Sequence, residues 1–498
     1  MGNDVPARQR LYWFLALITL FRLIVASSFE LSLDEGYYWL WSKNLDLSYY
    51  DHPPMIAYVL ALATYFSDAE IFIRLAPILG SVVTSLLLYE MANDLYNDEC
   101  AGFNAVLMAN VTLIFSAGAL IATPDTPLVP FYTAAMMLTF KAVRSEPGSW
   151  DGYTLWTAAG AAIGGAMLSK YTAFFFFPCA LLYFFLSTRG RAWLKRPEPY
   201  LASFISFIVF MPVIVWNSRH DWVSLSFQAK HGLAEIGGNP FDRFLEFAGL
   251  QIVLYSAGIF FFLIAAGVSV SKSSYKEVHP RAREAALFLF SFSIPIIGFF
   301  VLNSFRARVE GNWPILGVIP LFLRAGKMAG GWYSSPRFKI PFRASLAIAL
   351  LLWIVFHVQL TNPVIPHPKR FEIGRRVYGW RLLGAKIDEA KKSGDVSFIV
   401  SNRHQIATLM TYYTEPHMRA YLIGANNDRF TFLPPPDSMK GKNAIYLTEM
   451  GRDMIKSITP LFDKVETLEK VDIVRKGELI RSFTLYLCYN YHGGLDRL

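Results

Sequence analysis

Long runs of apolar residues alternate with short polar stretches from the N-terminus to about residue 361. A helix that crosses a bilayer needs about 20 mostly apolar residues, and eleven runs approach or reach this length. The predicted spans lie near 11–30, 70–91, 101–121, 127–143, 153–169, 171–187, 200–217, 246–270, 285–303, 313–324 and 343–361. The run 53–66 is too short to cross, so we interpret it as a membrane-surface or re-entrant helix. The pattern predicts a polytopic α-helical membrane protein.

The pattern changes at about Asn362, where the linker NPVIPHPKR begins. Strands that alternate with helices are typical of a small layered α/β unit. The predicted elements are an amphipathic helix at 375–392, a strand at 396–401, a helix at 403–413, strands near 418–423 and 443–448, and a strand pair within 463–489. We therefore predict two domains, a transmembrane domain at 1–361 and a soluble α/β domain at 362–498.

Composition and charge agree with a membrane protein. Charged residues make up 17% of the chain, against roughly a quarter in soluble domains. A net charge of +9 would suggest nucleic acid in a soluble protein, but here the basic residues lie in loops between apolar runs. The positive-inside rule then predicts a cytoplasmic N-terminus and an outer C-terminal domain. The first run follows Arg8 and Arg10 and lacks a cleavage site, so it is predicted to be a retained signal anchor.

The three cysteines, Cys100, Cys179 and Cys488, are far apart and match no metal-ligand spacing. A disulfide framework is therefore not expected. Metal dependence stays open, because carboxylates are available as ligands for a divalent ion but no Asp-x-Asp spacing requires one.

The predicted topology gathers polar and aromatic residues at the outer face of the membrane. Ionisable groups at membrane depth are costly and are functional candidates by default. The candidates are Arg22, Asp34, Glu35, Tyr37, Tyr38, Trp39, Asp51, His52, Arg74, Asp125, Lys170, Tyr171, Arg306, Arg308 and Glu310.

Several candidates also have a structural explanation. Asp34 and Glu35 could cap a helix N-terminus, where acidic residues are favoured. Asp125 lies between prolines and could be a turn residue, and Arg22 could extend its head group toward water. The aromatic residues could belong to an interfacial belt. These alternatives stay open at the level of sequence.

A stretch at 31–60, LSLDEGYYWLWSKNLDLSYYDHPPMIAYVL, carries an Asp-Glu pair, an aromatic cluster and a His-Pro-Pro. With FIRLAPILGS, ATPDTPL, LSKYTA and RVEGNWP, this stretch resembles bacterial GT-C glycosyltransferases related to protein O-mannosyltransferases and to the lipid A aminoarabinose transferase. GWRLLGAKIDEA and FIVSNRHQIATLMTYY resemble the soluble extension of some members, so the resemblance covers essentially the whole chain.

The resemblance implies a GT-C fold and an inverting sugar transfer at the periplasmic face of a bacterial inner membrane. The donor would be a polyprenyl-phosphate sugar, and the acceptor would be lipid A or another surface glycan rather than a protein. Membrane lipids are the expected surroundings. A multi-pass transporter or flippase for lipid-linked sugars is the alternative, but we find no internal repeat of the kind that transporters show.

The same resemblance suggests roles for the candidates. A hydroxyl acceptor needs a base, and Asp34 is our choice, with Glu35 positioning it or the acceptor. The leaving phosphate needs cations, for which we expect Arg74, Lys170 and Arg22, followed by Arg306 and Arg308. The remaining substrate contacts are expected from Tyr37, Tyr38, Trp39, Asp51, His52, Asp125, Tyr171 and Glu310.

Overall fold

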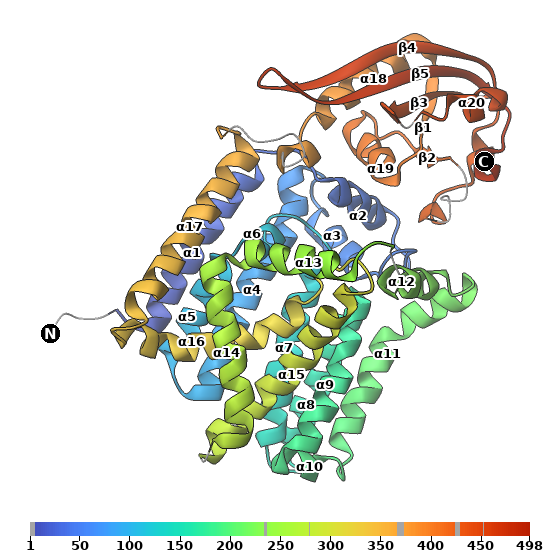
Figure 1. The fold of residues 1–498 in the computed structure, drawn as a ribbon. Helices are drawn as coiled ribbons and strands as arrows, with labels where there is room; N and C mark the ends of the chain where they lie inside the picture. Colours follow the sequence, from blue (N-terminus) through green and yellow to red (C-terminus); the bar gives the residue numbers. More distant parts are fainter. Residues whose placement is uncertain (1–4, 234–236, 278, 366–372, 424–428, 452) are drawn as a thin grey trace. The chain divides into compact units, whose positions relative to one another are not determined.

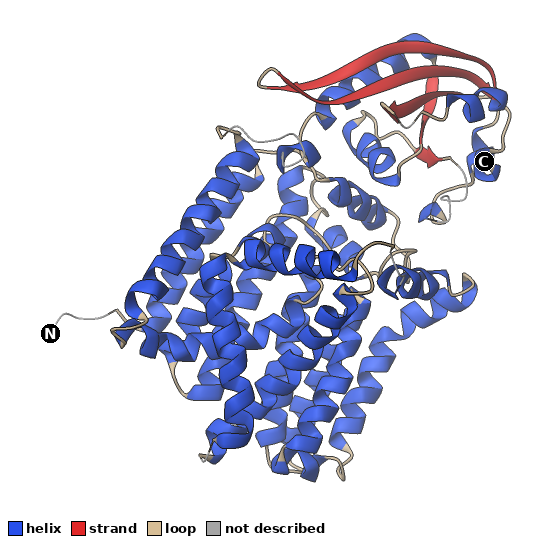
Figure 2. Ribbon diagram, viewed as in Figure 1, coloured by secondary structure: helices blue, strands red, loops and turns tan. Residues whose placement is uncertain are grey.

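The computed structural model describes residues 5–233, 237–277, 279–365, 373–423, 429–451 and 453–498. These residues are mostly helical and include one five-stranded sheet (Figures 1 and 2). They divide into two compact units. The first consists of Met1–Ile24, Asp51–Ile56 and Arg74–Phe356, and the second of Val25–Tyr50, Ala57–Ile73 and His357–Leu498. The domain boundary that we predict at residue 362 stays a prediction. The second unit also includes two earlier segments, which lie about 300 residues before this boundary.

Six helices among the described residues are long and apolar enough to cross a membrane. They are α1 (Ala7–Ala26), α4 (Glu70–Tyr96), α11 (Glu198–Arg219), α14 (Ala257–Lys276), α15 (Pro280–Ser304) and α17 (Lys339–Thr361). The other helices of this region are α3 (Met55–Ala63), α5 (Glu99–Asn110), α6 (Leu113–Gly118), α7 (Asp125–Arg144), α8 (Trp150–Ser169), η1 (Tyr171–Phe175), α9 (Phe176–Leu186), α10 (Thr188–Trp193), α12 (Val223–Leu233), α13 (Pro240–Tyr255) and α16 (Ile315–Ser334). Each predicted span coincides with one or two of these helices.

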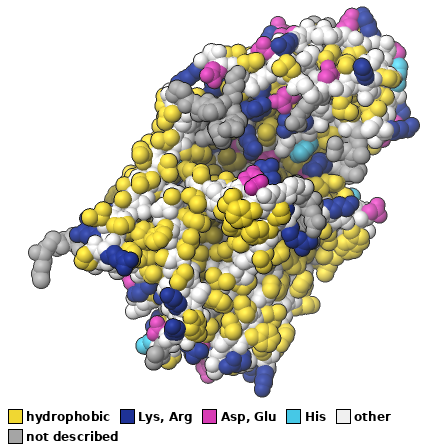
Figure 3. All heavy atoms as spheres, viewed as in Figure 1, with side chains coloured by type: hydrophobic (Ala, Val, Ile, Leu, Met, Phe, Trp, Pro, Cys, Tyr) yellow, Lys and Arg dark blue, Asp and Glu magenta, His cyan; other side chains and the backbone are white. Residues whose placement is uncertain are grey.

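The helices of the first unit carry apolar side chains on their outer surfaces (Figure 3). Leu17 on α1, Phe204 on α11, Phe261 on α14 and Leu351 on α17 are all more than half exposed. Exposed apolar surface of this extent marks contact with a membrane or a partner. Together with the lengths of the helices, it identifies a multi-pass membrane protein.

Two predicted spans are interrupted between helices, and a third, 171–187, begins as the 3₁₀ helix η1 before it continues as α9. The run 101–121 forms α5 and α6, which are separated at Val111 and Thr112. The run 246–270 is broken at Ser256, whose φ of 58° and ψ of 142° lie outside the helical region, so that α13 ends and α14 begins there. The prediction of one continuous helix was wrong at both places, because apolar residues continue on both sides of each break.

Glycines allow α8 to pack very closely on α11. A Cβ at Gly160 would lie 2.4 Å from the carbonyl oxygen of Ala202, and a Cβ at Gly164 would lie 2.5 Å from Cβ of Val209. Small residues four positions apart permit such close approach of membrane helices. This contact fixes α8, and Lys170 is the residue that directly follows its last turn.

The sheet belongs to the second unit and has the strand order β2-β1-β3-β5-β4. The strands are β1 (Val396–Ser401), β2 (Ala420–Leu422), β3 (Asn443–Glu449), β4 (Phe462–Arg475) and β5 (Glu478–Tyr491). β1 pairs in parallel with β2 and β3, whereas β5 is antiparallel to β3 and β4. The strands and the helices α18 (Trp380–Gly394) and α19 (His404–Tyr413) fall close to their predicted positions.

Helix α2 (Leu33–Lys43) packs on α19 within the second unit. At Gly36 the two helices approach so closely that a Cβ would lie 2.8 Å from Cδ2 of Leu409. Asp34 therefore has a tertiary neighbour on α19, although the two helices are separated by about 370 residues of sequence.

Candidate active site

Glu35 stabilises the beginning of α2. The side chain of Ser32 accepts a hydrogen bond from the backbone N–H of Glu35 at 3.4 Å, and the Glu35 carboxylate accepts one from the N–H of Ser32 at 2.8 Å. This reciprocal pair is a capping box, and Glu35 is completely buried. The capping explanation therefore applies to Glu35, with Ser32 as the cap residue. A role in positioning the acceptor stays a prediction.

Asp34, on the same turn, is only half-buried. Its Oδ1 atom lies 3.3 Å from Nε2 of Gln405 at the beginning of α19. A guanidinium nitrogen of Arg403 lies 3.4 Å from the amide oxygen of Gln405, and another is 2.9 Å from the Glu449 carboxylate. This contact to the amide oxygen orients the N–H groups of Gln405 toward Asp34. Glu449, Arg403 and Gln405 thus form a hydrogen-bonded series that ends on the candidate base.

Sequence reasoning missed these three residues. Arg403 and Gln405 follow β1, and Glu449 is the last residue of β3. Because β1 and β3 are parallel neighbours, their carboxyl ends lie at one edge, where α/β sheets place functional groups. The signal available in the sequence was the run of polar residues NRHQ, which directly follows a predicted strand.

The aromatic residues Tyr37, Tyr38 and Trp39 are buried within the second unit. Tyr37 contacts the ring of His404 with centroids 4.9 Å apart, and Trp39 contacts Tyr412 at the same separation. Trp39 also donates a hydrogen bond of 2.9 Å to Asp68. These contacts pack α2 on α19, and stacking on a sugar or a prenyl chain stays a prediction for all three.

His404 is neutral in this environment. Burial, together with the nearby charges of Arg429 and Arg403, lowers the pKa of its imidazole to about 3. The ring therefore packs against Tyr37 as an uncharged aromatic group and contributes no cation to the surroundings of Asp34 at neutral pH.

In the first unit, Lys170 and Asp125 form a close ion pair. The ammonium nitrogen of Lys170 lies 2.8 Å and 3.1 Å from the two carboxylate oxygens of Asp125, and both side chains are at most 15% exposed. Asn312 donates a further hydrogen bond to the same carboxylate. Lys170 terminates α8, Asp125 begins α7, and Asn312 precedes α16, so three helix ends bring the cluster together. Asn312 lies in the RVEGNWP segment but was not singled out from the sequence.

The two arginines with the deepest burial are also in the first unit. Arg22 on α1 donates hydrogen bonds to Ser81 at 3.0 Å and to Asn110 at 2.9 Å. The Asn110 amide in turn donates to Ser85 at 3.1 Å. Arg22 and Arg74 are both fully buried. Arg22 therefore links α1, α4 and α5 through neutral polar groups, and the binding of phosphate by either arginine stays a prediction.

The remaining candidates of the first unit have contacts of their own. The carbonyl oxygen of Asp51 accepts a hydrogen bond from Gln228, and the hydroxyl of Tyr171 lies 2.8 Å from that of Ser224. Arg308 and Glu310 form an exposed ion pair at 3.6 Å. Two further candidates, His52 and Arg306, are part-buried and exposed, respectively. The structure thus brings together Lys170 with Asp125, and Arg308 with Glu310.

No group of three or more His, Cys, Asp or Glu side chains suited to a metal ion occurs within the part of the chain that the structure describes. The three cysteines are free thiols. The candidate groups are a half-buried carboxylate with an amide donor in one unit and a lysine held by a carboxylate in the other.

Comparison with known proteins defines the class to which these features belong. The family model described as dolichyl-phosphate-mannose-protein mannosyltransferase matches residues 51–216. A lipid A galacturonosyltransferase, RgtD of Rhizobium johnstonii, is 24% identical over 413 residues, which cover 81% of this chain and 82% of the relative.

Solved structures show the same fold. ArnT from Cupriavidus metallidurans bound to undecaprenyl phosphate matches with a TM-score of 0.65 and 14% identity over 95% of this chain and 97% of that chain. The archaeal oligosaccharyltransferase AglB from Archaeoglobus fulgidus matches with a TM-score of 0.50 and 12% identity over 87% and 69% of the two chains.

These comparisons confirm the resemblance that the sequence predicted. The chain is a membrane glycosyltransferase with an ArnT-like GT-C fold and a small sheet-containing unit. The flippase alternative is not favoured, because the matching family model and RgtD are both named as transferases.

Proposed function

We propose that this chain transfers a sugar, with inversion, from a polyprenyl-phosphate donor to lipid A or another surface glycan at the periplasmic face of the inner membrane. The observation that carries the proposal is the similarity to a lipid A galacturonosyltransferase over four fifths of both chains. The undecaprenyl phosphate bound to the structurally similar ArnT supports the choice of donor.

The residues supply the chemistry that this reaction needs. The acceptor hydroxyl attacks the anomeric carbon, loses its proton to Asp34, and displaces polyprenyl phosphate. A carboxylate with one amide donor and partial exposure can accept this proton. Lys170 would bind the phosphate that leaves, and Asp125 would hold the ammonium group in place. Arg74 and Arg22 are further candidates for this phosphate.

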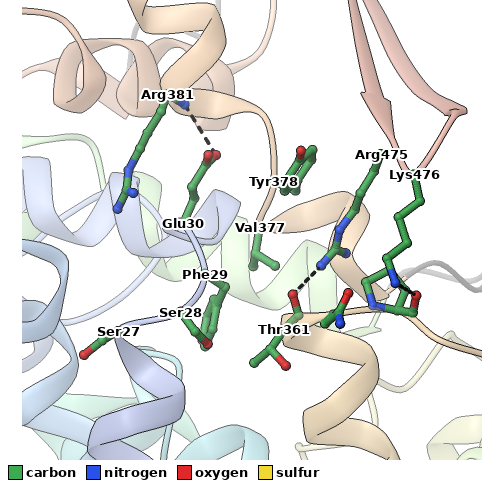
Figure 4. Close-up of a pocket in the computed structure, with 12 residues that line it drawn as sticks. Ser27, Ser28, Phe29, Glu30, Thr361, Val377, Tyr378, Arg381, Arg475 and Lys476 are labelled. Atoms are coloured by element: carbon green, nitrogen blue, oxygen red, sulfur yellow. Dashed lines mark hydrogen bonds between the residues drawn. The ribbon is translucent and has the colours of Figure 1, made fainter.

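We also propose eleven spans, a cytoplasmic N-terminus and a periplasmic C-terminal region. Ser27 to Glu30, which follow α1, and Thr361, at the end of α17, line one cavity of the second unit (Figure 4). This shared cavity supports placing the C-terminal ends of α1 and α17 on the same side of the membrane. An odd number of spans with the two termini on opposite sides agrees with this arrangement and with the positive-inside rule.

Reporter fusions test this topology. A reporter fused after Arg191, in a loop rich in basic residues, should be active in the cytoplasm, and one fused after Lys440 should be active in the periplasm. A reporter pair that reports one common compartment would contradict the proposed orientation.

The function itself is tested by incubating the purified protein with a polyprenyl-phosphate-linked sugar and purified lipid A, followed by mass spectrometry of the lipids. We expect the acceptor to gain one sugar and the donor to become polyprenyl phosphate. Surface lipids from a deletion strain, analysed in the same way, would identify the sugar. Movement of intact donor across proteoliposome membranes without its consumption would instead support the flippase alternative.

A further inference from the structure

Four arginines gather around one carboxylate at the edge of the sheet where β1 and β3 end. Arg375 and Arg376 end the 3₁₀ helix η3 (Ile373–Arg376), Arg403 follows β1, and Arg481 lies on β5. The carboxylate is that of Glu449, the last residue of β3. All five residues belong to the second unit, and we call the four arginines the arginine cluster.

Arg481 is the buried member of the arginine cluster, with 7% of the residue exposed. It donates a hydrogen bond to the carbonyl oxygen of Arg375, and its guanidinium carbon lies 4.4 Å from the centre of the Trp380 ring. The indole N–H of Trp380 in turn donates to the carbonyl oxygen of Arg376 at 3.1 Å. These contacts fix η3 through its backbone, so they do not depend on the side chains of Arg375 and Arg376.

Positive charge exceeds negative charge in this group of residues. The Glu449 carboxylate forms ion pairs with Arg403 at 2.9 Å and with Arg375 at 3.7 Å. Arg376 is exposed and takes part in no ion pair within the part of the chain that the structure describes. Even with the Asp34 carboxylate included, the four arginines stand against only two negative charges. The arginine cluster therefore suits an anionic ligand.

The guanidinium groups also act on one another. Burial is the main reason why the pKa of Arg481 is lowered to about 10. The positive charges of Arg375, Arg403 and Arg376 act in the same direction, and the charge of Glu449 opposes them. Because Arg481 still carries its charge at neutral pH, this repulsion persists there. A ligand with more than one negative charge would relieve it.

Three of the guanidinium groups are accessible to such a ligand. The side chains of Arg375 and Arg403 are 47% and 26% exposed, and Arg376 is exposed as well. Planar guanidinium groups bind phosphate through paired N–H···O hydrogen bonds. A phosphate monoester carries about 1.5 to 2 negative charges at pH 7, so it balances the excess better than a single carboxylate would. The chemistry of the cluster therefore favours a phosphate group.

The connection to Asp34 indicates which substrate carries this phosphate. Arg403 donates to Gln405 and Gln405 donates to Asp34, so the cluster begins two hydrogen bonds away from the candidate base. In an inverting transfer, the base acts on the attacking group, on the face of the sugar opposite to the leaving group. A phosphate bound beside Asp34 therefore belongs to the acceptor and not to the polyprenyl phosphate that leaves.

We propose that Arg375, Arg376 and Arg403 bind a phosphate group of the acceptor, and that Arg481 adds its charge from the interior of the unit. This inference rests on the proposed sugar transfer, and it narrows the acceptor to a phosphorylated glycolipid or glycan. Binding of the phosphate would hold the acceptor with its attacking hydroxyl near Asp34.

Native mass spectrometry of the full-length protein in detergent tests the proposal through acceptor binding alone. The protein is titrated with lipid A that carries two phosphates and with the same lipid A after removal of both phosphates. We expect clearly tighter binding of the phosphorylated form. Loss of one hydrogen bond to a charged group weakens binding about tenfold. Arg376→Gln should therefore weaken binding of phosphorylated lipid A about tenfold, and Arg375→Gln/Arg376→Gln about 100-fold.

Arg497→Gln is the matched control. Arg497 is exposed in the same unit but follows Tyr491, whose backbone N–H donates to the carbonyl oxygen of Lys442 before the first residue of β3. It thus lies at the opposite end of β3 from the cluster, and its replacement should leave the affinity unchanged. The cluster variants should keep the melting temperature of the parent protein, because exposed ion pairs contribute little to stability.

Undecaprenyl phosphate, titrated separately, distinguishes the two possible sources of the phosphate. We expect the parent and the double variant to bind it equally well. A selective loss of this binding in the double variant would overturn the proposal, because the cluster would then hold the leaving group. Equal affinity of the parent and the double variant for phosphorylated lipid A would also overturn it. These titrations contain no sugar donor, so an absence of sugar transfer would refute the proposed function without changing their result.

Discussion

Asp34→Asn is expected to abolish sugar transfer while the protein still folds and binds its donor. The amide keeps the size of the side chain and can still accept the hydrogen bond from Gln405, whose Nε2 lies 3.3 Å away. It cannot accept the proton of the acceptor hydroxyl. General base catalysis contributes about 10²- to 10⁴-fold, so kcat should fall by at least that order. Donor binding, turnover and melting temperature should be measured on the same preparation.

Glu35→Gln provides the matched comparison. Glutamine is accepted at the third position of a capping box, so α2 should keep its N-terminal cap and the protein its stability. Because Glu35 is buried and its carboxylate takes part in the helix cap, we expect a much smaller loss of turnover than for Asp34→Asn. An inactive, stable Glu35→Gln enzyme together with an active Asp34→Asn enzyme would mean that the roles of the two carboxylates are reversed.

Gln405→Leu tests whether the hydrogen bond from Gln405 influences the Asp34 carboxylate. This change removes the amide donor to Asp34 but leaves the base itself. Loss of a hydrogen bond to a carboxylate favours its protonated form, so the acid limb of the pH–rate profile should move to higher pH. A profile identical to that of the parent enzyme would show that Gln405 does not influence Asp34.

Lys170→Ala is expected to impair use of the lipid donor and also to lower stability. A hydrogen bond to a charged group contributes about 1.5–3 kcal/mol, which corresponds to a loss of about 10- to 100-fold in kcat/KM for the donor. Removal of the lysine also leaves the Asp125 carboxylate, 15% exposed, without its cation. Breaking a buried ion pair in this way costs about 3 kcal/mol or more. Donor kinetics and melting temperature should therefore both change.

The double variant Lys170→Met/Asp125→Asn distinguishes binding of the donor from structural support. Both charges are removed, and the amide at 125 can still accept the hydrogen bond from Asn312. Neutral replacement of an ion pair is often tolerated, so stability should recover. If Lys170 binds the donor phosphate, kcat/KM should stay low. Recovery of activity together with stability would assign Lys170 a purely structural role.

The sequence by itself determined those helices and strands that depend mainly on residues near one another in the chain. Apolar runs predicted helices where the structure has them. A helix that crosses a bilayer must be mostly apolar over the thickness of the membrane, whichever helices pack beside it. The strand at 396–401 and the helix that follows were predicted from their periodicity and agree with β1 and α19. The family resemblance came from short motifs that lie within single loops and helix ends.

Only the tertiary structure decided the partners of the candidate residues. Gln405 is 371 positions from Asp34, and no local pattern indicates which of many polar residues will meet across such a distance. The break at Ser256 depends on a single backbone conformation inside an apolar run. The assignment of Glu35 to a helix cap and of Asp125 to Lys170 required coordinates, because a carboxylate serves equally well as a cap, an ion-pair partner or a base. Hydrophobic pattern fixes where a segment must be buried, whereas the pairing of polar side chains depends on which surfaces pack together.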